Sequence, residues 1–192
     1  MSIPLSRRFE EALVYANQLH AKQIRKGSGT PYVSHLLAVT SLVIEAGGDE
    51  DTAIAALLHD GPEDQGGRET LALIRERFGD RVADIVAACS DTFENPKPPW
   101  EERKRAYLAH LPHATPDTLL VSCADKLHNA RAILRDYRDC GDQLWHRFNG
   151  GKQGTLWYYR ELVEQFGRAT VPPILLNELA LVVDEIEALV ES

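Results

Sequence analysis

The sequence predicts an all-α protein whose helices pack as a single-domain bundle, with a metal site between helices. Apolar residues recur every three or four positions in most segments, the spacing that gives a helix one buried face. Capping residues, glycines and prolines separate these segments. No segment alternates apolar and polar residues as a half-buried strand does.

The composition limits the fold and the partners. The chain has 192 residues, 44% hydrophobic and 26% charged, enough for one domain with a substantial core. No apolar run is long enough to cross a bilayer, and residues 1–9 lack the apolar core of a signal peptide. Three cysteines without Cys-x-x-Cys spacing indicate reduced thiols and a cytoplasmic protein. The net charge of −8 argues against a nucleic-acid partner but is compatible with a small anionic one.

Three helices are expected in the first third of the chain. The first is amphipathic and covers Arg7–Ile24. Glycines and a proline predict a loop over 25–32, after which Ser34 can cap a second helix that begins near His35. A third helix, Asp49–His59, is apolar nearly all round and should lie at the centre of the protein.

The remaining segments also predict helices. The expected ranges are Glu69–Phe78, Arg81–Ser90, Glu101–Leu111, a long helix from Thr115 past Leu134, Thr155–Phe166 and a last helix from Pro173 to Val190. A Gly-rich stretch, 149–154, precedes the helix that begins at Thr155. Arg103, Lys104 and Arg105 are expected to form a solvated face, and a contact from one of them to a phosphate stays open as the alternative.

Four ionisable residues cluster where the apolar third helix ends. His59 and Asp60 lie side by side, and Glu63 and Asp64 follow directly after Gly61-Pro62. Burying unpaired charge is costly, so packing alone gives no reason for this cluster. A divalent cation would make it favourable.

The candidate metal ligands are His35, His59, Asp60 and Asp125, which the expected helices carry on three separate elements. Two imidazoles and two carboxylates suit Mn²⁺, Fe²⁺ or Zn²⁺ better than Ca²⁺. Four protein ligands around a six-coordinate ion leave room for water and substrate, as hydrolysis requires.

Each of these residues also has an ordinary structural explanation. His35 can be a helix-end histidine, and Asp125 can be the buried partner of Lys126. Glu63 and Asp64 can be exposed turn residues. Spacing alone therefore leaves the metal and structural interpretations open.

Several separated segments together resemble one family. Arg25-Lys26 precedes Gly29-Thr30-Pro31-Tyr32 and His35; His59-Asp60-x-x-Glu63-Asp64 and Ala124-Asp125-Lys126-Leu127-His128-Asn129 follow in the same order. This pattern is similar to the HD-type hydrolase domain of Rel/Spo alarmone enzymes, most strongly over residues 7–165. The length of the chain is similar to that of the small stand-alone hydrolases of the metazoan type. The Gly-rich stretch 149–154 departs from them.

The resemblance implies a guanosine-3′,5′-bis(diphosphate) 3′-pyrophosphohydrolase that uses Mn²⁺, with Fe²⁺ or Zn²⁺ as alternatives. It implies that His35, His59, Asp60 and Asp125 bind the metal and that Glu63 and Asp64 activate or orient the attacking water. It further implies that the nucleotide is bound by Arg25, Lys26 and Asn129, and we add Lys152 as a candidate for the same role. If the resemblance holds, residues 1–192 form one phosphohydrolase domain. The expected partner is a small-molecule nucleotide, with no nucleic acid or membrane, and a homo-oligomer remains open.

Two other functions compete with this one. The first is a phosphatase of the wider HD superfamily acting on another phosphorylated nucleotide. The second is a non-catalytic nucleotide-binding module, against which the intact carboxylates Glu63 and Asp64 argue. The loop Arg25–Tyr32 favours the alarmone hydrolase, because the resemblance associates it with that branch.

Overall fold

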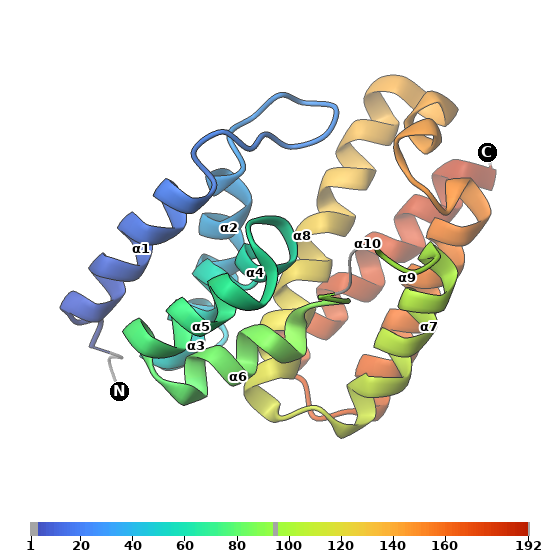
Figure 1. The fold of residues 1–192 in the computed structure, drawn as a ribbon. Helices are drawn as coiled ribbons and strands as arrows, with labels where there is room; N and C mark the ends of the chain where they lie inside the picture. The colour runs from blue at the N-terminus through green and yellow to red at the C-terminus, as the bar shows by residue number, and fades with distance from the viewer. Residues whose placement is uncertain (1–3, 94–95, 192) are drawn as a thin grey trace.

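The computed structural model describes residues 4–93 and 96–191, and it confirms the predicted all-α fold (Figure 1). An isolated antiparallel bridge joins Ile24 to Pro31. The helices are α1 (Arg7–Leu19), α2 (Val33–Glu45), α3 (Glu50–Leu58), α4 (Gly61–Asp64), α5 (Gly67–Phe78), α6 (Asp80–Cys89), α7 (Trp100–His110), η1 (Leu111–His113), α8 (Pro116–Cys140), η2 (Gly141–Arg147), α9 (Gly151–Arg168) and α10 (Pro173–Glu191).

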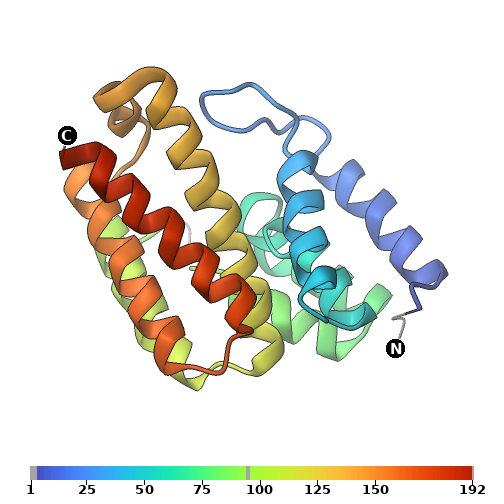
Figure 2. The same ribbon diagram turned by 180° about the vertical axis from the view of Figure 1, so that it is seen from behind.

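The long helix α8 runs between two groups of helices (Figures 1 and 2). On one side it contacts α2, α3 and α6, and on the other it contacts α9, α10 and η2. It begins as the sequence predicts, since the Thr115 side chain accepts a hydrogen bond from the backbone N–H of Thr118 and Pro116 occupies the first turn. Side chains from its middle therefore reach the interior between the two groups.

Helix α3 is the buried centre that the sequence predicts. Every residue from Ala53 to Leu58 is fully buried. Full burial of a leucine or isoleucine side chain contributes about 1.5–3 kcal/mol. The end of α3 is therefore firmly placed, and His59 and Asp60 leave it from inside the core.

Four boundaries differ most from the sequence-based prediction. Helix α2 begins at Val33 with Tyr32 as its N-cap, so Ser34 lies in the first turn and does not cap the helix. Helix α1 ends at Leu19 instead of Ile24, because the chain turns there and residues 24–31 form a hairpin closed by the hydrogen bond from Arg25 N–H to Thr30 O. Gly61 and Pro62 end α3 as expected but also begin the one-turn helix α4, where proline in the first turn removes no helical hydrogen bond. Helix α9 begins at Gly151, so most of the Gly-rich stretch is helical.

The glycines at the start of α9 are explained by close packing. A Cβ atom at Gly150 would lie 2.6 Å from the indole of Trp100, and one at Gly154 would lie 3.1 Å from it. The tryptophan of α7 therefore lies directly against this backbone. Among the described residues, none of the helices combines the length and the apolar character needed to span a membrane.

The N-terminus of α3 gives a first test of the fold. The Asp49 carboxylate accepts hydrogen bonds from Thr52 N–H at 3.0 Å and Thr52 Oγ1 at 2.7 Å, and it pairs with Arg81 at 2.6 Å. Partial burial opposes the charged form, but the hydrogen bonds from Thr52 and Arg81 outweigh it and lower the pKa of Asp49.

We expect Asp49→Ala to lower the free energy of unfolding by about 1 kcal/mol, measured by urea denaturation at neutral pH. Because the folded-state pKa is lowered, this stabilisation is present above the unfolded pKa and disappears as the pH falls through the folded pKa. The difference between wild type and variant should therefore shrink in acid. Asp184→Ala, at an exposed site on α10, is the control. Equal stability of wild type and Asp49→Ala at neutral pH would contradict the capping role.

Candidate active site

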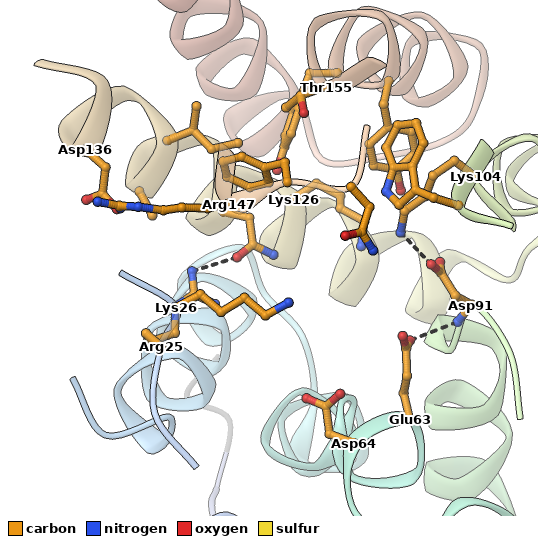
Figure 3. Close-up of a pocket in the computed structure, with 18 of the residues that line it drawn as sticks. Arg25, Lys26, Glu63, Asp64, Asp91, Lys104, Lys126, Asp136, Arg147 and Thr155 are labelled. Carbon is orange, nitrogen blue, oxygen red and sulfur yellow. Dashed lines mark hydrogen bonds and ion pairs between the residues drawn. The ribbon is translucent and has the colours of Figure 1, made fainter. Parts of the chain in front are cut away.

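A cavity of about 560 Å³ opens where the hairpin 24–31, α4, α7, α8, η2 and α9 meet (Figure 3). Seven cationic side chains line it (Arg25, Lys26, Lys97, Arg103, Lys104, Lys126 and Arg147) against four carboxylates (Glu63, Asp64, Asp91 and Asp136). The chain as a whole has a net charge of −8. A locally positive cavity in an acidic protein favours an anionic ligand.

The candidate metal cluster lies beside this cavity. His35 comes from α2, His59 from the end of α3 and Asp125 from α8, and one ligand atom from each lies within 4.8 Å of the others. Asp60 is close to both imidazoles, with its Oδ2 3.4 Å from His35 Nε2 and 3.1 Å from His59 Nε2. The Oδ1 atom of Asp125 lies 3.2 Å from His35 Nε2.

The imidazoles show that a metal fits this cluster. His35 is fully buried and His59 is 2% exposed, and their Nε2 atoms have no hydrogen-bond partner within the described part of the chain. A buried polar atom without a partner is costly, and both nitrogens face the same two carboxylates. Two imidazole nitrogens and two carboxylates form a mixed N/O donor set that suits a divalent transition metal.

Neighbouring groups hold the imidazoles in the orientation that a metal needs. His59 Nδ1 donates to the carbonyl of Ala56 at 2.8 Å, which leaves its Nε2 lone pair facing the cluster. His35 Nδ1 lies 2.7 Å from His128 Nδ1, and when His35 donates in this contact its Nε2 is left free. Metal-binding histidines usually have such a partner at the second nitrogen.

The carboxylates are held in the same way. The two oxygens of Asp125 accept hydrogen bonds from Asn129 and Lys126, each at 2.6 Å. Asp60 Oδ2 accepts one from the Tyr32 hydroxyl at 2.6 Å. The Asp64 carboxylate accepts one from the Gln23 amide at 2.7 Å. Side chains on either side of the hairpin and on α8 therefore hold these carboxylates in place.

The protonation states agree with this arrangement. Burial opposes ionisation of Asp125, but the charge of Lys126 and the adjacent imidazoles of His35 and His59 hold its pKa well below the ordinary value. Burial also opposes ionisation of Asp60, and the adjacent His59 imidazole outweighs it to lower that pKa as well. Burial, with the charges of His35 and Arg25, lowers the pKa of His128 to about 4. His128 is therefore a neutral acceptor for His35.

Comparison with known proteins identifies the family. A family model described as "HD domain" matches residues 12–156. This chain belongs to the HD domain family.

A relative from Xenopus tropicalis, named guanosine-3′,5′-bis(diphosphate) 3′-pyrophosphohydrolase MESH1, is 40% identical over 138 residues, which cover 70% of this chain and 72% of that protein. A solved structure titled "A metazoan ortholog of SpoT hydrolyzes ppGpp and plays a role in starvation responses" superposes with a TM-score of 0.73 at 27% identity, covering 98% of this chain and 97% of that one. A Listeria monocytogenes structure gives 0.70 at 32% identity, covering 83% and 99%.

The structure brings most of the residues singled out from the sequence to one place. His35, His59, Asp60 and Asp125 lie together as described above. Arg25, Lys26, Glu63, Asp64 and Asn129 line the cavity beside them. Arg25 Nη2 donates to Asn129 Oδ1 at 2.9 Å, and its guanidinium lies 5.8 Å from the ring centroid of Tyr32.

Lys152 lies apart from these residues. It occupies the first turn of α9 and pairs with Asp142 of η2 at 3.1 Å, and it is not among the residues that line the cavity. Lys152 and Asp142 are 10 residues apart in the sequence, one at the start of α9 and the other in η2, so they can pair locally.

The sequence-based description of residues 103–105 is wrong for two of them. The side chains of Arg103 and Lys104 are only 11% and 16% exposed and both pair with Asp91, whereas Arg105 is 63% exposed and pairs with Glu101. Sequence reasoning also overlooked Gln23 and Asp91. Asp91 carries no local signal, because its partners lie on a helix 12 and 13 residues away.

The contact between His35 and His128 gives a second test. We expect His128→Ala to weaken the binding of a divalent metal about 10- to 100-fold, because His35 loses the partner that orients its ring. Titration of metal into the purified protein, followed by calorimetry, measures this. His110→Ala, at an exposed site on α7, is the control. Unchanged metal affinity in His128→Ala would show that His35 does not depend on this partner.

Proposed function

We propose that this chain is a metal-dependent 3′-pyrophosphohydrolase of guanosine 3′,5′-bis(diphosphate), with residues 1–192 acting as one phosphohydrolase domain. The observation that carries the proposal is the buried cluster of His35, His59 and Asp125, with Asp60 against both imidazoles, beside a positively charged cavity. The choice of substrate rests on the names of the relatives, which are 3′-pyrophosphohydrolases of guanosine-3′,5′-bis(diphosphate). The mixed N/O donor set supports Mn²⁺ as the metal, with Fe²⁺ and Zn²⁺ as alternatives.

In the proposed reaction a water molecule attacks the phosphorus that is bonded to the ribose 3′-oxygen. The bond between that phosphorus and the 3′-oxygen breaks, the 3′-oxygen takes up a proton, and the products are pyrophosphate and GDP; a substrate with a 5′-triphosphate would give GTP instead. His35, His59, Asp60 and Asp125 would hold the metal. A bound divalent metal polarises the phosphoryl group and lowers the pKa of a coordinated water.

Glu63 is the candidate to orient that water and take its proton. It follows Asp60 by one helical turn, and its carboxylate is held by Lys97 Nζ at 2.9 Å and by Asp91 N–H at 3.2 Å. A carboxylate fixed at both oxygens is a positioned base rather than a mobile surface group. Asp64, held by Gln23, supports the same water.

The nucleoside belongs near Arg25 and Asn129. The planar guanidinium of Arg25 can stack on a base, and Asn129 couples it to Asp125 by two hydrogen bonds in series. Lys26 adds positive charge at the same rim of the cavity (Figure 3). Lys152 has no part in this proposal, because Asp142 pairs with it outside the cavity.

The proposal predicts that the protein releases pyrophosphate from ppGpp when Mn²⁺ is present and does not when the metal is removed by a chelator. Product release is measured with separate assays for pyrophosphate and orthophosphate. Release of orthophosphate alone would indicate a phosphatase of the wider superfamily instead. Binding of ppGpp with no turnover in the presence of Mn²⁺ would indicate a nucleotide-binding module.

Two variants should separate metal binding from proton transfer. Asp60→Ala is expected to abolish tight metal binding and activity together. Glu63→Gln is expected to keep the metal affinity and lower kcat about 10²- to 10⁴-fold, the usual contribution of a positioned base. Glu69→Gln, exposed on α5, is the control for Glu63. A Glu63→Gln enzyme with wild-type kcat would remove Glu63 from the mechanism.

A further inference from the structure

One wall of the cavity carries two cations that the proposed reaction does not yet use. Arg103 and Lys104 lie on consecutive positions of α7 and face inward, 11% and 16% exposed. Arg103 donates to Asp91 at 2.8 Å and Lys104 donates to the same Asp91 oxygen at 2.5 Å. Both residues line the cavity.

The charges on this wall are not balanced. Arg103 and Lys104 share one carboxylate, Asp91, so the three residues together carry one net positive charge. Lys97 is paired with Glu63, and Lys126 with Asp125. Positive charge left over at a partly buried site favours an anion, and charge-assisted hydrogen bonds to phosphate are among the stronger ones in proteins.

A neighbouring group also lacks a partner. Tyr158 of α9 lines the cavity and is 5% exposed, and its hydroxyl has no hydrogen-bond partner among the residues that the structure describes. Lys104 Nζ lies 5.0 Å from the centroid of the Tyr158 ring. A buried hydroxyl without a partner is uncommon, and it adds a hydrogen-bond donor to this wall.

The wall lies across the cavity from the proposed nucleoside site. Figure 3 shows Arg25 and Lys26 at one side, Lys104 and Asp91 at the other, and Lys126 between them. Lys126 pairs with the candidate ligand Asp125, and Glu63, one turn after Asp60, accepts a hydrogen bond from Asp91 N–H. The metal cluster thus borders the middle of the cavity, with a cationic group on each side of it.

We propose that Arg103 and Lys104 bind the terminal phosphate of the 3′-diphosphate, so that this chain selects a diphosphate over a monophosphate at the 3′ position. This inference rests on the proposed function. With the nucleoside at Arg25 and the attacked phosphorus at the metal cluster, the second phosphate extends away from the ribose, toward α7. There it meets the cations that now share Asp91.

The first test compares two substrates on the wild-type protein. Guanosine 5′-diphosphate 3′-diphosphate should be hydrolysed with a kcat/KM about 10- to 100-fold above that of guanosine 5′-diphosphate 3′-monophosphate, the effect of one or two charge-assisted hydrogen bonds. Equal kcat/KM values for the two compounds would overturn the proposal without any variant.

The second test removes the positive charge of Lys104. Lys104→Gln should lower kcat/KM for the diphosphate about tenfold more than kcat/KM for the monophosphate, whereas Lys104→Arg should retain the preference. Arg105→Gln is the matched control, one position along α7, because Arg105 is exposed and pairs with Glu101. Thermal melting of each variant checks that it folds. A folded Lys104→Gln protein with the wild-type preference would overturn the proposal.

A binding measurement separates this inference from the proposed activity. Inorganic pyrophosphate should bind the metal-free wild-type protein in calorimetry, and Lys104→Gln should weaken that binding about tenfold while Arg105→Gln does not. If pyrophosphate binding depends on Lys104 but the protein does not hydrolyse ppGpp, the proposed function is refuted and the anion site stands. If the protein hydrolyses ppGpp but Lys104→Gln binds pyrophosphate as tightly as wild type, the anion site is refuted and the proposed function stands.

Discussion

The structure depends on one constraint: two imidazole nitrogens are buried and have no hydrogen-bond partner among residues 4–93 and 96–191. The Nε2 atoms of His35 and His59 face Asp60 and Asp125 inside the protein, where an unsatisfied polar atom is costly. The rest of the fold holds these groups in place despite that cost. Helix α3 is buried along Ala53–Leu58, and outward partners at Ala56 and His128 fix the two rings. The proposed cation, held by these four side chains together, would account for this arrangement.

Helix α8 connects this cluster to both sides of the cavity. Asp125 contributes to the cluster, Asn129 one turn later hydrogen-bonds Arg25, and Lys126 pairs with Asp125 toward the wall of α7 and α9. The position of α8 between the two groups of helices makes this possible (Figures 1 and 2). A displacement of α8 would therefore disturb the metal cluster and both cationic groups at once, which links the stability of the fold to the geometry of the site.

Local patterns in the sequence are sufficient to predict the helices and the cluster of His59, Asp60, Glu63 and Asp64, but they do not predict contacts between distant segments. The apolar run before His59 predicts a buried α3, and Thr115-Pro116 predicts the start of α8, because these signals lie within a few residues of the feature. The hairpin 24–31 was read as part of a helix and a loop, since the Ile24–Pro31 bridge depends on how the chain turns after Leu19. Arg103 and Lys104 were expected in solvent because their burial depends on Asp91, outside their helix. Lys152 carries no local signal that separates it from the substrate residues, and its position depends on the pairing with Asp142 and on how α9 packs against the cavity.

The most direct measurement is an anomalous difference map from crystals soaked in MnCl₂ and recorded near the manganese absorption edge. This account predicts one strong peak within coordination distance of His35 Nε2, His59 Nε2 and carboxylate oxygens of Asp60 and Asp125. A manganese peak elsewhere, with the two imidazoles still facing each other unoccupied, would contradict it.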